Sequence, residues 1–302
     1  MFSLPNNVTI IEVGPRDGLQ NEKNEVSTET KLEFIQALQN AGIQEMEITS
    51  FVSPKWVPQM ADSADIVQNV LKEGRQIVLT PNAKGVELAL NSGATSVAVF
   101  VGVSNTFNQK NINKTTDQTM QELRLIINKL KEKKIFVRAC ISTAFYCPYE
   151  GKIALEDTIS LCREFATWGV DELSVADTIG MANPLESYLL FSKLVEEVPN
   201  MMMTAHFHDT RKMGLANIVA AMQAGITRFD TSAGGLGGCP FAPGATGNVA
   251  TEDVVNMLHT MGIQTGIDLD LLCEAVSVID PYVSRPIDTG IYRLFTLNHE
   301  QI

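Results

Sequence analysis

The sequence predicts a (β/α)8 barrel, because strand-like and helix-like segments alternate eight times along one chain of 302 residues. Each strand-like segment is a short apolar run, and the segments between them carry apolar residues at helical spacing. Strict alternation of strands and helices implies a parallel sheet. Eight such units in about 250 residues match this barrel in size. An open doubly wound sheet is the alternative, but the chain lacks a G-x-G-x-x-G turn after its first strand.

The predicted strands are the runs 8–13, 43–49, 76–80, 96–101, 135–142, 170–176, 202–208 and 226–231. Helical spacing is clearest over residues 32–38, 66–71, 120–130 and 215–222. Glycine adopts the left-handed conformation without steric cost, so a glycine just before a strand is predicted to end the preceding helix. This applies to Gly42, Gly74, Gly93, Gly169 and Gly225. Asn183, followed by Pro184, is a typical helix start.

No linker, low-complexity tract or block of like charge divides the chain. We therefore expect a single catalytic domain over residues 1–302, with residues 263–302 as a helical C-terminal extension. The net charge of −12 argues against a nucleic-acid partner, and no apolar run approaches the length of a membrane span. The N-terminal residues resemble neither a secretory signal nor a transit peptide. Five cysteines without a Cys-x-x-Cys pair suit thiols in a reducing cytoplasm.

His206 and His208 lie two residues apart in the predicted strand 202–208, so they should face the same way. Two imidazoles that converge on one point predict a metal site; the alternative is a hydrogen-bonded pair of core histidines. Asp17, after the first strand, would add an oxygen ligand. Mixed nitrogen and oxygen ligands indicate Mg²⁺, Mn²⁺, Co²⁺ or catalytic Zn²⁺. Asn248 either completes the ligand set or caps a helix that starts near Val249.

The active site of such a barrel lies at the C-terminal ends of its strands, which for the sixth and eighth strands are near Asp177 and Asp230. Arg16, next to Asp17, suits an anionic substrate or a developing oxyanion, and the alternative is a surface ion pair. Glu47 alternates with apolar neighbours in the second strand and should face the lumen. Arg138, a single basic residue, is expected to be solvated or to contact an anion.

The run 232–240 has four glycines in nine residues and ends in a thiol and a proline. Such a loop permits close approach and movement, which predicts a lid. Cys239 in that lid could act as an acid, a base or a nucleophile, and an ordinary flexible loop is the alternative. A phosphate-binding loop is less favoured, because the required glycine spacing is absent.

Several of these segments together closely resemble 3-hydroxy-3-methylglutaryl-CoA (HMG-CoA) lyases. The matching stretches are EVGPRDGLQNE (12–22), TSFVSPKWVPQM (49–60), CPYEGK (147–152), GGLGGCP (234–240) and NVATED (248–253). The resemblance, which extends to about residue 266, implies Mg²⁺ or Mn²⁺ held by Asp17, His206, His208 and Asn248. It also implies that Arg16 polarises the substrate carbonyl, that Glu47 and Asp177 support the site, and that Cys239 is a proton-handling thiol.

The implied reaction is carbon–carbon cleavage of HMG-CoA to acetyl-CoA and acetoacetate, as in leucine catabolism and ketone-body formation. The resemblance further implies an acyl-CoA substrate and a cytoplasmic homodimer of bacterial type. The nearest rival is a condensing transferase on a similar barrel, whose motif typically has glutamate where this chain has Leu19. A metal hydrolase would need more imidazoles, and a binding protein would not explain the triad and the thiol together. Arg211 and Lys212 stand where tyrosine and glycine are expected in the animal enzymes.

Overall fold

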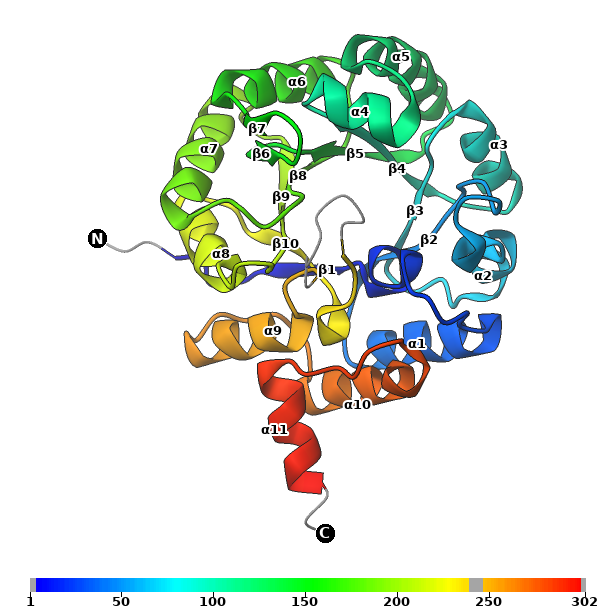
Figure 1. The fold of residues 1–302 in the computed structure, drawn as a ribbon, viewed down its shortest axis with the longest axis vertical. Coiled ribbons are helices and arrows are strands. Elements are labelled where there is room, and N and C mark those ends of the chain that lie inside the picture. The colour runs from blue at the N-terminus through cyan, green and yellow to red at the C-terminus, as the bar shows by residue number, and fades with distance from the viewer. Residues whose placement is uncertain (1–3, 239–246, 300–302) are drawn as a thin grey trace.

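Eight parallel strands close into a barrel in the computed structural model, which describes residues 4–238 and 247–299 (Figure 1). The strands follow one another around the ring in chain order, and β10 closes the ring against β1. The predicted fold is therefore confirmed, and each predicted strand is present. The bounds are β1 (Thr9–Glu12), β2 (Glu45–Ser50), β3 (Arg75–Leu79), β4 (Ser96–Gly102), β5 (Phe136–Ser142), β8 (Glu172–Asp177), β9 (Met202–Phe207) and β10 (Arg228–Thr231).

Helices surround the barrel and cover the outer faces of its strands (Figure 1). They are α1 (Thr28–Asn40), α2 (Ser63–Asn69), α3 (Ala83–Asn91), α4 (Asn105–Ile112), α5 (Thr116–Glu132), α6 (Leu155–Thr167), α7 (Pro184–Glu197), α8 (Gly214–Gln223) and α9 (Thr251–Thr260). A short hairpin of β6 (Tyr146–Cys147) and β7 (Gly151–Lys152) lies between β5 and α6. Three single-turn helices, η1 (Gly14–Gly18), η2 (Pro58–Met60) and η3 (Ala233–Gly235), follow strand ends.

The predicted helix ends are largely confirmed. Gly42 has a φ of 103°, and its N–H and that of Ile43 donate to the carbonyls of Gln39 and Leu38, which closes the last turn of α1. Gly74 is the exception: α2 ends at Asn69, so Gly74 does not cap it. Gly74 has a left-handed conformation and lies against the backbone of Gln44. Any side chain at this position would collide with that backbone.

The predicted start of α7 is also confirmed. The side chain of Asn183 accepts a hydrogen bond from the backbone N–H of Glu186. In turn, the Glu186 side chain accepts a hydrogen bond from the backbone N–H of Asn183. Pro184 occupies the first helical position, where it has no amide hydrogen to leave unpaired. The start of α7 fixes the loop that follows β8, and this loop borders the site.

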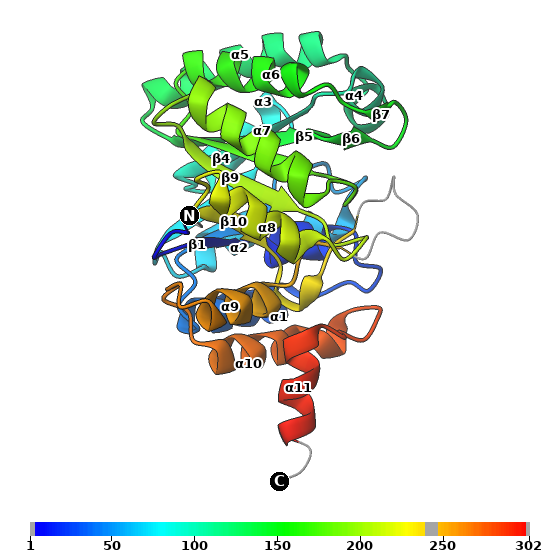
Figure 2. The same cartoon turned by 90° about the vertical axis from the view of Figure 1, so that its left-hand side faces the viewer.

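The C-terminal residues are helical, as expected. They form α10 (Leu269–Ile279), η4 (Asp280–Tyr282) and α11 (Gly290–His299). Figures 1 and 2 show α10 as an additional layer beside α1 and α9, with α11 projecting from it. A backbone hydrogen bond of 2.9 Å from Asp268 N–H to the carbonyl of Ala41 anchors this layer. Among the described residues, no helix is both long and apolar enough to cross a membrane.

The barrel lumen contains a small apolar cluster and a set of buried ionisable side chains. Next to β1, β3 and β4 it holds a small apolar cluster of Ile11, Val13, Ile77, Leu79 and Ala98. The other strands, β2, β5, β8, β9 and β10, contribute buried ionisable side chains. Arg138 of β5 is among them and is 0% exposed, so the expectation that it is solvated is wrong. Several of these ionisable side chains belong to the candidate site or contact it.

Candidate metal centre

His206 and His208 come from the C-terminal end of β9 and lie on the same face, as strand alternation predicts. Their ring centroids are 5.3 Å apart, and both side chains are buried. Phe207 faces the other way and packs against Phe145 and Phe191 of the core. The aromatic packing of Phe207 therefore fixes the direction in which the two imidazoles point.

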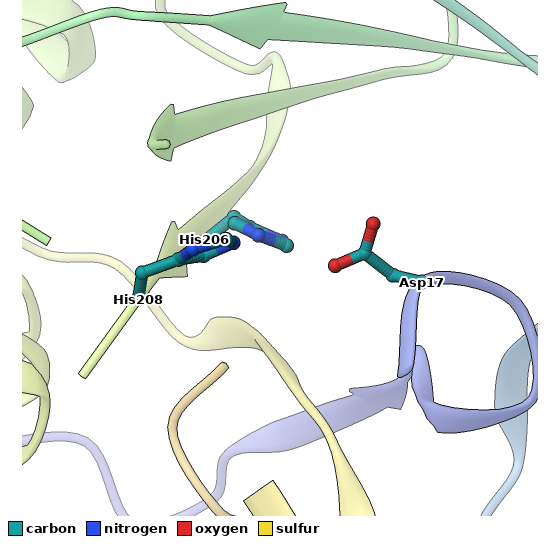
Figure 3. A group of neighbouring side chains, drawn as sticks. All are labelled: Asp17, His206 and His208. Atoms are coloured by element: carbon teal, nitrogen blue, oxygen red, sulfur yellow. The ribbon is translucent and has the colours of Figure 1, made fainter. Parts of the chain in front are cut away.

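Asp17 reaches the two imidazoles from η1, the turn that follows β1. The carbonyl of Val13 accepts hydrogen bonds from the amides of Arg16, Asp17 and Gly18, which makes this turn tight. Figure 3 shows the Asp17 carboxylate facing the two rings. One potential ligand atom from each of Asp17, His206 and His208 lies within 4.8 Å of the others. The structure thus brings together the three ligands predicted from positions far apart in the sequence.

The two histidines have different environments. The Nδ1 atom of His206 lies 3.1 Å from a carboxylate oxygen of Asp230, so Nδ1 carries the proton and Nε2 is left as a ligand atom. Burial lowers the pKa of His206, but the hydrogen bond and charge of Asp230 outweigh it and raise the pKa above its ordinary value. Burial, and then the neighbouring His206, lower the pKa of His208 to about 4. His208 is therefore neutral at pH 7, and its buried Nδ1 atom has no hydrogen-bond partner among the described residues.

Asn248 completes the group and does not cap a helix. Its Nδ2 atom donates to Oδ2 of Asp17 at 2.8 Å and to the carbonyl of Leu236 at 3.1 Å. The helix that follows, α9, begins at Thr251, and its N-cap residue is Ala250, so the capping alternative is wrong. The Oδ1 atom of Asn248 is buried and has no hydrogen-bond partner within residues 4–238 and 247–299.

The donor set fits a divalent cation. Two buried atoms, Nδ1 of His208 and Oδ1 of Asn248, lack a hydrogen-bond partner in the part of the chain that the structure describes. A buried polar atom without a partner costs about 1–3 kcal/mol, which a coordinated cation would offset. Two imidazoles, one carboxylate and one amide oxygen form a mixed nitrogen and oxygen set, as open catalytic sites for Mg²⁺, Mn²⁺ or Zn²⁺ use.

A buried arginine lies directly beside this group. Arg16 donates from Nε to Glu47 at 2.6 Å and from Nη1 to Asp17 at 2.5 Å. The side chains of Arg16 and Glu47 are only 10% and 1% exposed, so the surface ion-pair alternative is wrong. Burial would raise the pKa of Asp17, but Arg16 and then the two histidines lower it to about 2. Glu47 faces the lumen as predicted and holds the guanidinium in place.

Asp177, at the end of β8, is buried near the histidines. Its two carboxylate oxygens accept from the amides of Met181 at 3.0 Å and Ala182 at 2.9 Å, which fixes the turn before α7. Its backbone carbonyl accepts from the N–H of His208 at 3.4 Å. Burial raises the pKa of Asp177 to about 6. The structure thus gives Asp177 contacts to the loop that borders the site.

Cys239 lies outside the described residues, so its role stays a prediction. The described residues before and after it lie at the site. A side chain on Gly237 would meet the amide of Asn248, and the φ of Gly237 is +111°. Asn21 donates to the carbonyl of Gly238 at 2.9 Å, and Gly247 accepts from the N–H of Asp209 at 3.0 Å.

Arg138 lies beside the site, although it was expected only to be solvated or to contact an anion. Arg138 donates from Nη2 to Asp230 at 2.5 Å, and Asp230 in turn contacts His206. Strand alternation could have predicted that Arg138 faces the lumen, because Arg138 stands between the apolar Val137 and Ala139 of a predicted strand. The alternation that placed Glu47 in the lumen applies to Arg138 equally.

Comparison with known proteins shows which family this chain resembles. A model of the HMGL-like family matches residues 7–279. The hydroxymethylglutaryl-CoA lyase of Bacillus subtilis is 43% identical over 293 residues, which cover 96% of this chain and 98% of that protein. The crystal structure of hydroxymethylglutaryl-CoA lyase from Pseudomonas aeruginosa superposes with a TM-score of 0.94 at 39% identity, covering 98% of this chain and 99% of the other. The HMG-CoA lyase from Acinetobacter baumannii, solved in complex with coenzyme A and 3-methylmalate, gives 0.92 at 36% identity over 97% and 96% of the two chains.

Proposed function

Because the chain belongs to the HMGL-like family and is a lyase that cleaves HMG-CoA to acetyl-CoA and acetoacetate, we propose that this reaction takes place at the candidate metal centre. Asp17, His206, His208 and Asn248 would hold one divalent cation, Mg²⁺ or Mn²⁺. The observation that carries the proposal is the convergence of these four side chains, two of which have buried atoms that find no partner among the described residues.

Cleavage of the bond between C2 and C3 moves its electron pair onto the thioester, which becomes the enolate of acetyl-CoA. The C3 oxygen loses its proton and becomes the ketone of acetoacetate. When bound, the cation supplies Lewis-acid chemistry that lowers the pKa of the substrate hydroxyl. One proton leaves the C3 hydroxyl and one reaches the enolate carbon, so the overall reaction needs no external acid or base.

Arg16 stabilises the negative charge that develops on the thioester oxygen. Its guanidinium is buried, permanently charged and held between Glu47 and Asp17. A fixed cation in a water-poor site stabilises a transition state without reorganisation, and loss of such a donor typically costs about 10²- to 10³-fold in kcat. The Arg16 side chain is 10% exposed, and we assign this exposed part to contact with the substrate.

Cys239 is proposed to protonate the enolate carbon. A thiol with an ordinary pKa of about 8.5 is a suitable acid near neutral pH, provided that it is positioned close to the carbon. Support comes from the described glycines on both sides of the segment, because Gly237 packs against Asn248 and Asp17, and Gly247 packs against Gly237. Asp177 supports the site by fixing the turn between β8 and α7.

Product analysis tests the proposal. Protein stripped of metal and then loaded with Mn²⁺ is incubated with HMG-CoA, and acetoacetate and acetyl-CoA are measured. We expect His206→Ala and Asp17→Ala to lose both bound Mn²⁺ and turnover. His259→Ala is the matched control, because His259 is hydrogen-bonded to Thr265 at the far end of α9. Wild-type metal content and turnover in His206→Ala would overturn the assignment, and consumption of a 2-oxo acid with acetyl-CoA would indicate a synthase.

We further propose that the enzyme is a cytoplasmic homodimer that accepts acyl-CoA, within leucine catabolism and ketone-body formation. The acyl-CoA substrate is supported by the coenzyme A complex of the Acinetobacter baumannii lyase. Light scattering on purified protein tests the dimer, and a monomer at micromolar concentration would contradict it. A single cooperative unfolding transition would support the one-domain organisation over residues 1–302, and two separate transitions would oppose it.

A further inference from the structure

A buried ion network runs through the barrel lumen and has Arg138 at its centre. Nη2 of Arg138 donates to Oδ1 of Asp230 at 2.5 Å. Its Nη1 lies 3.5 Å from Oε1 of Glu47, and its Nε lies 3.7 Å from Oε2 of Glu172. The Arg138 side chain is 0% exposed. Three carboxylates from three other strands thus surround one guanidinium.

The two arms of this network end on two different ligands of the metal centre. On one arm, the second oxygen of Asp230, Oδ2, faces Nδ1 of His206 at 3.1 Å. On the other arm, Glu47 holds Arg16, and Arg16 is paired with Asp17 at 2.5 Å. Charges of alternating sign therefore connect Asp17 to His206 through the interior of the barrel.

Stability alone gives little reason to bury this arginine. Within the described part of the chain, Nε and Nη1 of Arg138 have no hydrogen-bond partner at normal distance. A buried ion pair is often no more stable than apolar residues of similar volume. Glu47 and Glu172 also have other partners, because Glu47 pairs with Arg16 and Glu172 accepts from Arg228 at 3.0 Å. The geometry around His206 provides the missing reason.

We propose that Arg138 is a positioning residue for the cleavage reaction, an inference that rests on the proposed metal site. By holding Oδ1 of Asp230, Arg138 directs Oδ2 to His206. This acceptor keeps the proton of His206 on Nδ1 and leaves Nε2 as the ligand atom. Arg138 also contacts Glu47, which holds Arg16, so His206 and Arg16 are connected through Arg138.

The proposal predicts a specific effect of Asp230→Asn. Arg138 can only donate, so the amide oxygen must face Arg138, and the amide NH2 must face His206. Nδ1 of His206 then has to accept a hydrogen bond, and its proton moves to Nε2, which can no longer bind a cation. In Asp230→Asn combined with Arg138→Met, the amide is free to turn its oxygen to His206, because Ser174 can donate or accept. The second substitution should therefore rescue the first.

Two measurements that do not depend on turnover test this. Mn²⁺ affinity is measured by calorimetry without substrate, with thermal unfolding as a check on the fold. We expect Asp230→Asn to weaken binding about 10- to 100-fold, and Arg138→Met to restore a clear part of the loss in the double variant. Arg75→Met is the matched control, because Arg75 pairs with Glu45 at 2.8 Å in the same barrel and does not reach the site. Its Mn²⁺ affinity should equal that of the wild type.

Nitrogen NMR of ¹⁵N-histidine in the metal-free protein at pH 8 provides the second measurement, and only four histidines need to be assigned. We expect the Nδ1–H form of His206 in the wild type and the Nε2–H form in Asp230→Asn, which requires no Arg138 variant. An unchanged form of His206 in Asp230→Asn, or a double variant that binds Mn²⁺ no more tightly than the single one, would overturn the inference. If instead the wild type bound no Mn²⁺, the proposed metal site itself would fail.

Discussion

Glu12 links η1, the turn that holds Arg16 and Asp17, to η3 and to the start of α9. Replacing Glu12 should change how the free energy of unfolding depends on pH. Its side chain is 0% exposed. One carboxylate oxygen accepts from the amides of Gly14 at 2.7 Å and Ala233 at 2.9 Å, and the other accepts from the hydroxyl of Thr251 at 2.6 Å. Burial outweighs these hydrogen bonds and raises the pKa of Glu12 from 4.5 to about 7.

A raised pKa means that the folded state binds this proton more tightly than the unfolded state does. The resulting stability is fully present below the unfolded pKa of 4.5 and is lost as pH rises through about 7. Each pKa unit corresponds to about 1.4 kcal/mol, so the wild type should lose roughly 2.5 kcal/mol between pH 5 and pH 8 from this group. Glu12→Gln has no such titration, and the other buried carboxyl groups are common to both proteins.

Urea unfolding of the wild type and of Glu12→Gln at pH 5, 6, 7 and 8 measures this difference. The stability of the wild type relative to the variant should fall steadily with pH. Glu12→Ala should lose roughly 2–6 kcal/mol at every pH, because it leaves two buried amides without an acceptor. Glu25→Gln, at an exposed position, is the control and should stay within about 0.5 kcal/mol of the wild type. A difference between Glu12→Gln and the wild type that stays constant from pH 5 to pH 8 would refute the reasoning.

The remaining predictions concern the metal and the thiol. Asn248→Ala should raise the Kd for Mn²⁺ about 10- to 100-fold with an unchanged circular dichroism spectrum, and an unaltered Kd would exclude Asn248 as a ligand. Mn²⁺ binding should weaken about tenfold per pH unit below the raised pKa of His206, because the proton competes for the ligand atom; calorimetry across pH 5 to 8 would contradict this if the Kd stayed level. Cys239→Ser should keep Mn²⁺ and substrate binding but lose about 10²- to 10⁴-fold in kcat, whereas near-normal turnover would remove the thiol from the mechanism.

Much of the fold could be predicted because its signals are local. Apolar periodicity located every barrel strand, since a strand between the lumen and a layer of helices must be apolar over most of its length. The pairing of His206 with His208 follows from the alternation of a single strand and needs no knowledge of its neighbours. Asp17 could be added because parallel strands place their C-terminal ends at one face of the barrel.

Only the tertiary structure decided which side chains meet across the lumen. The register that sets Arg138 opposite Glu172, and the closure of β10 on β1, depend on strand stagger, which no single segment encodes. Asn248 could be a ligand or a helix cap until the start of α9 was known to lie at Thr251. Gly74 has the left-handed backbone conformation of a helix cap, but it is needed because the backbone of Gln44 lies against it. Burial and contact between distant strands are properties of the closed barrel, so the network from Asp17 to His206 exists only once the ring has formed.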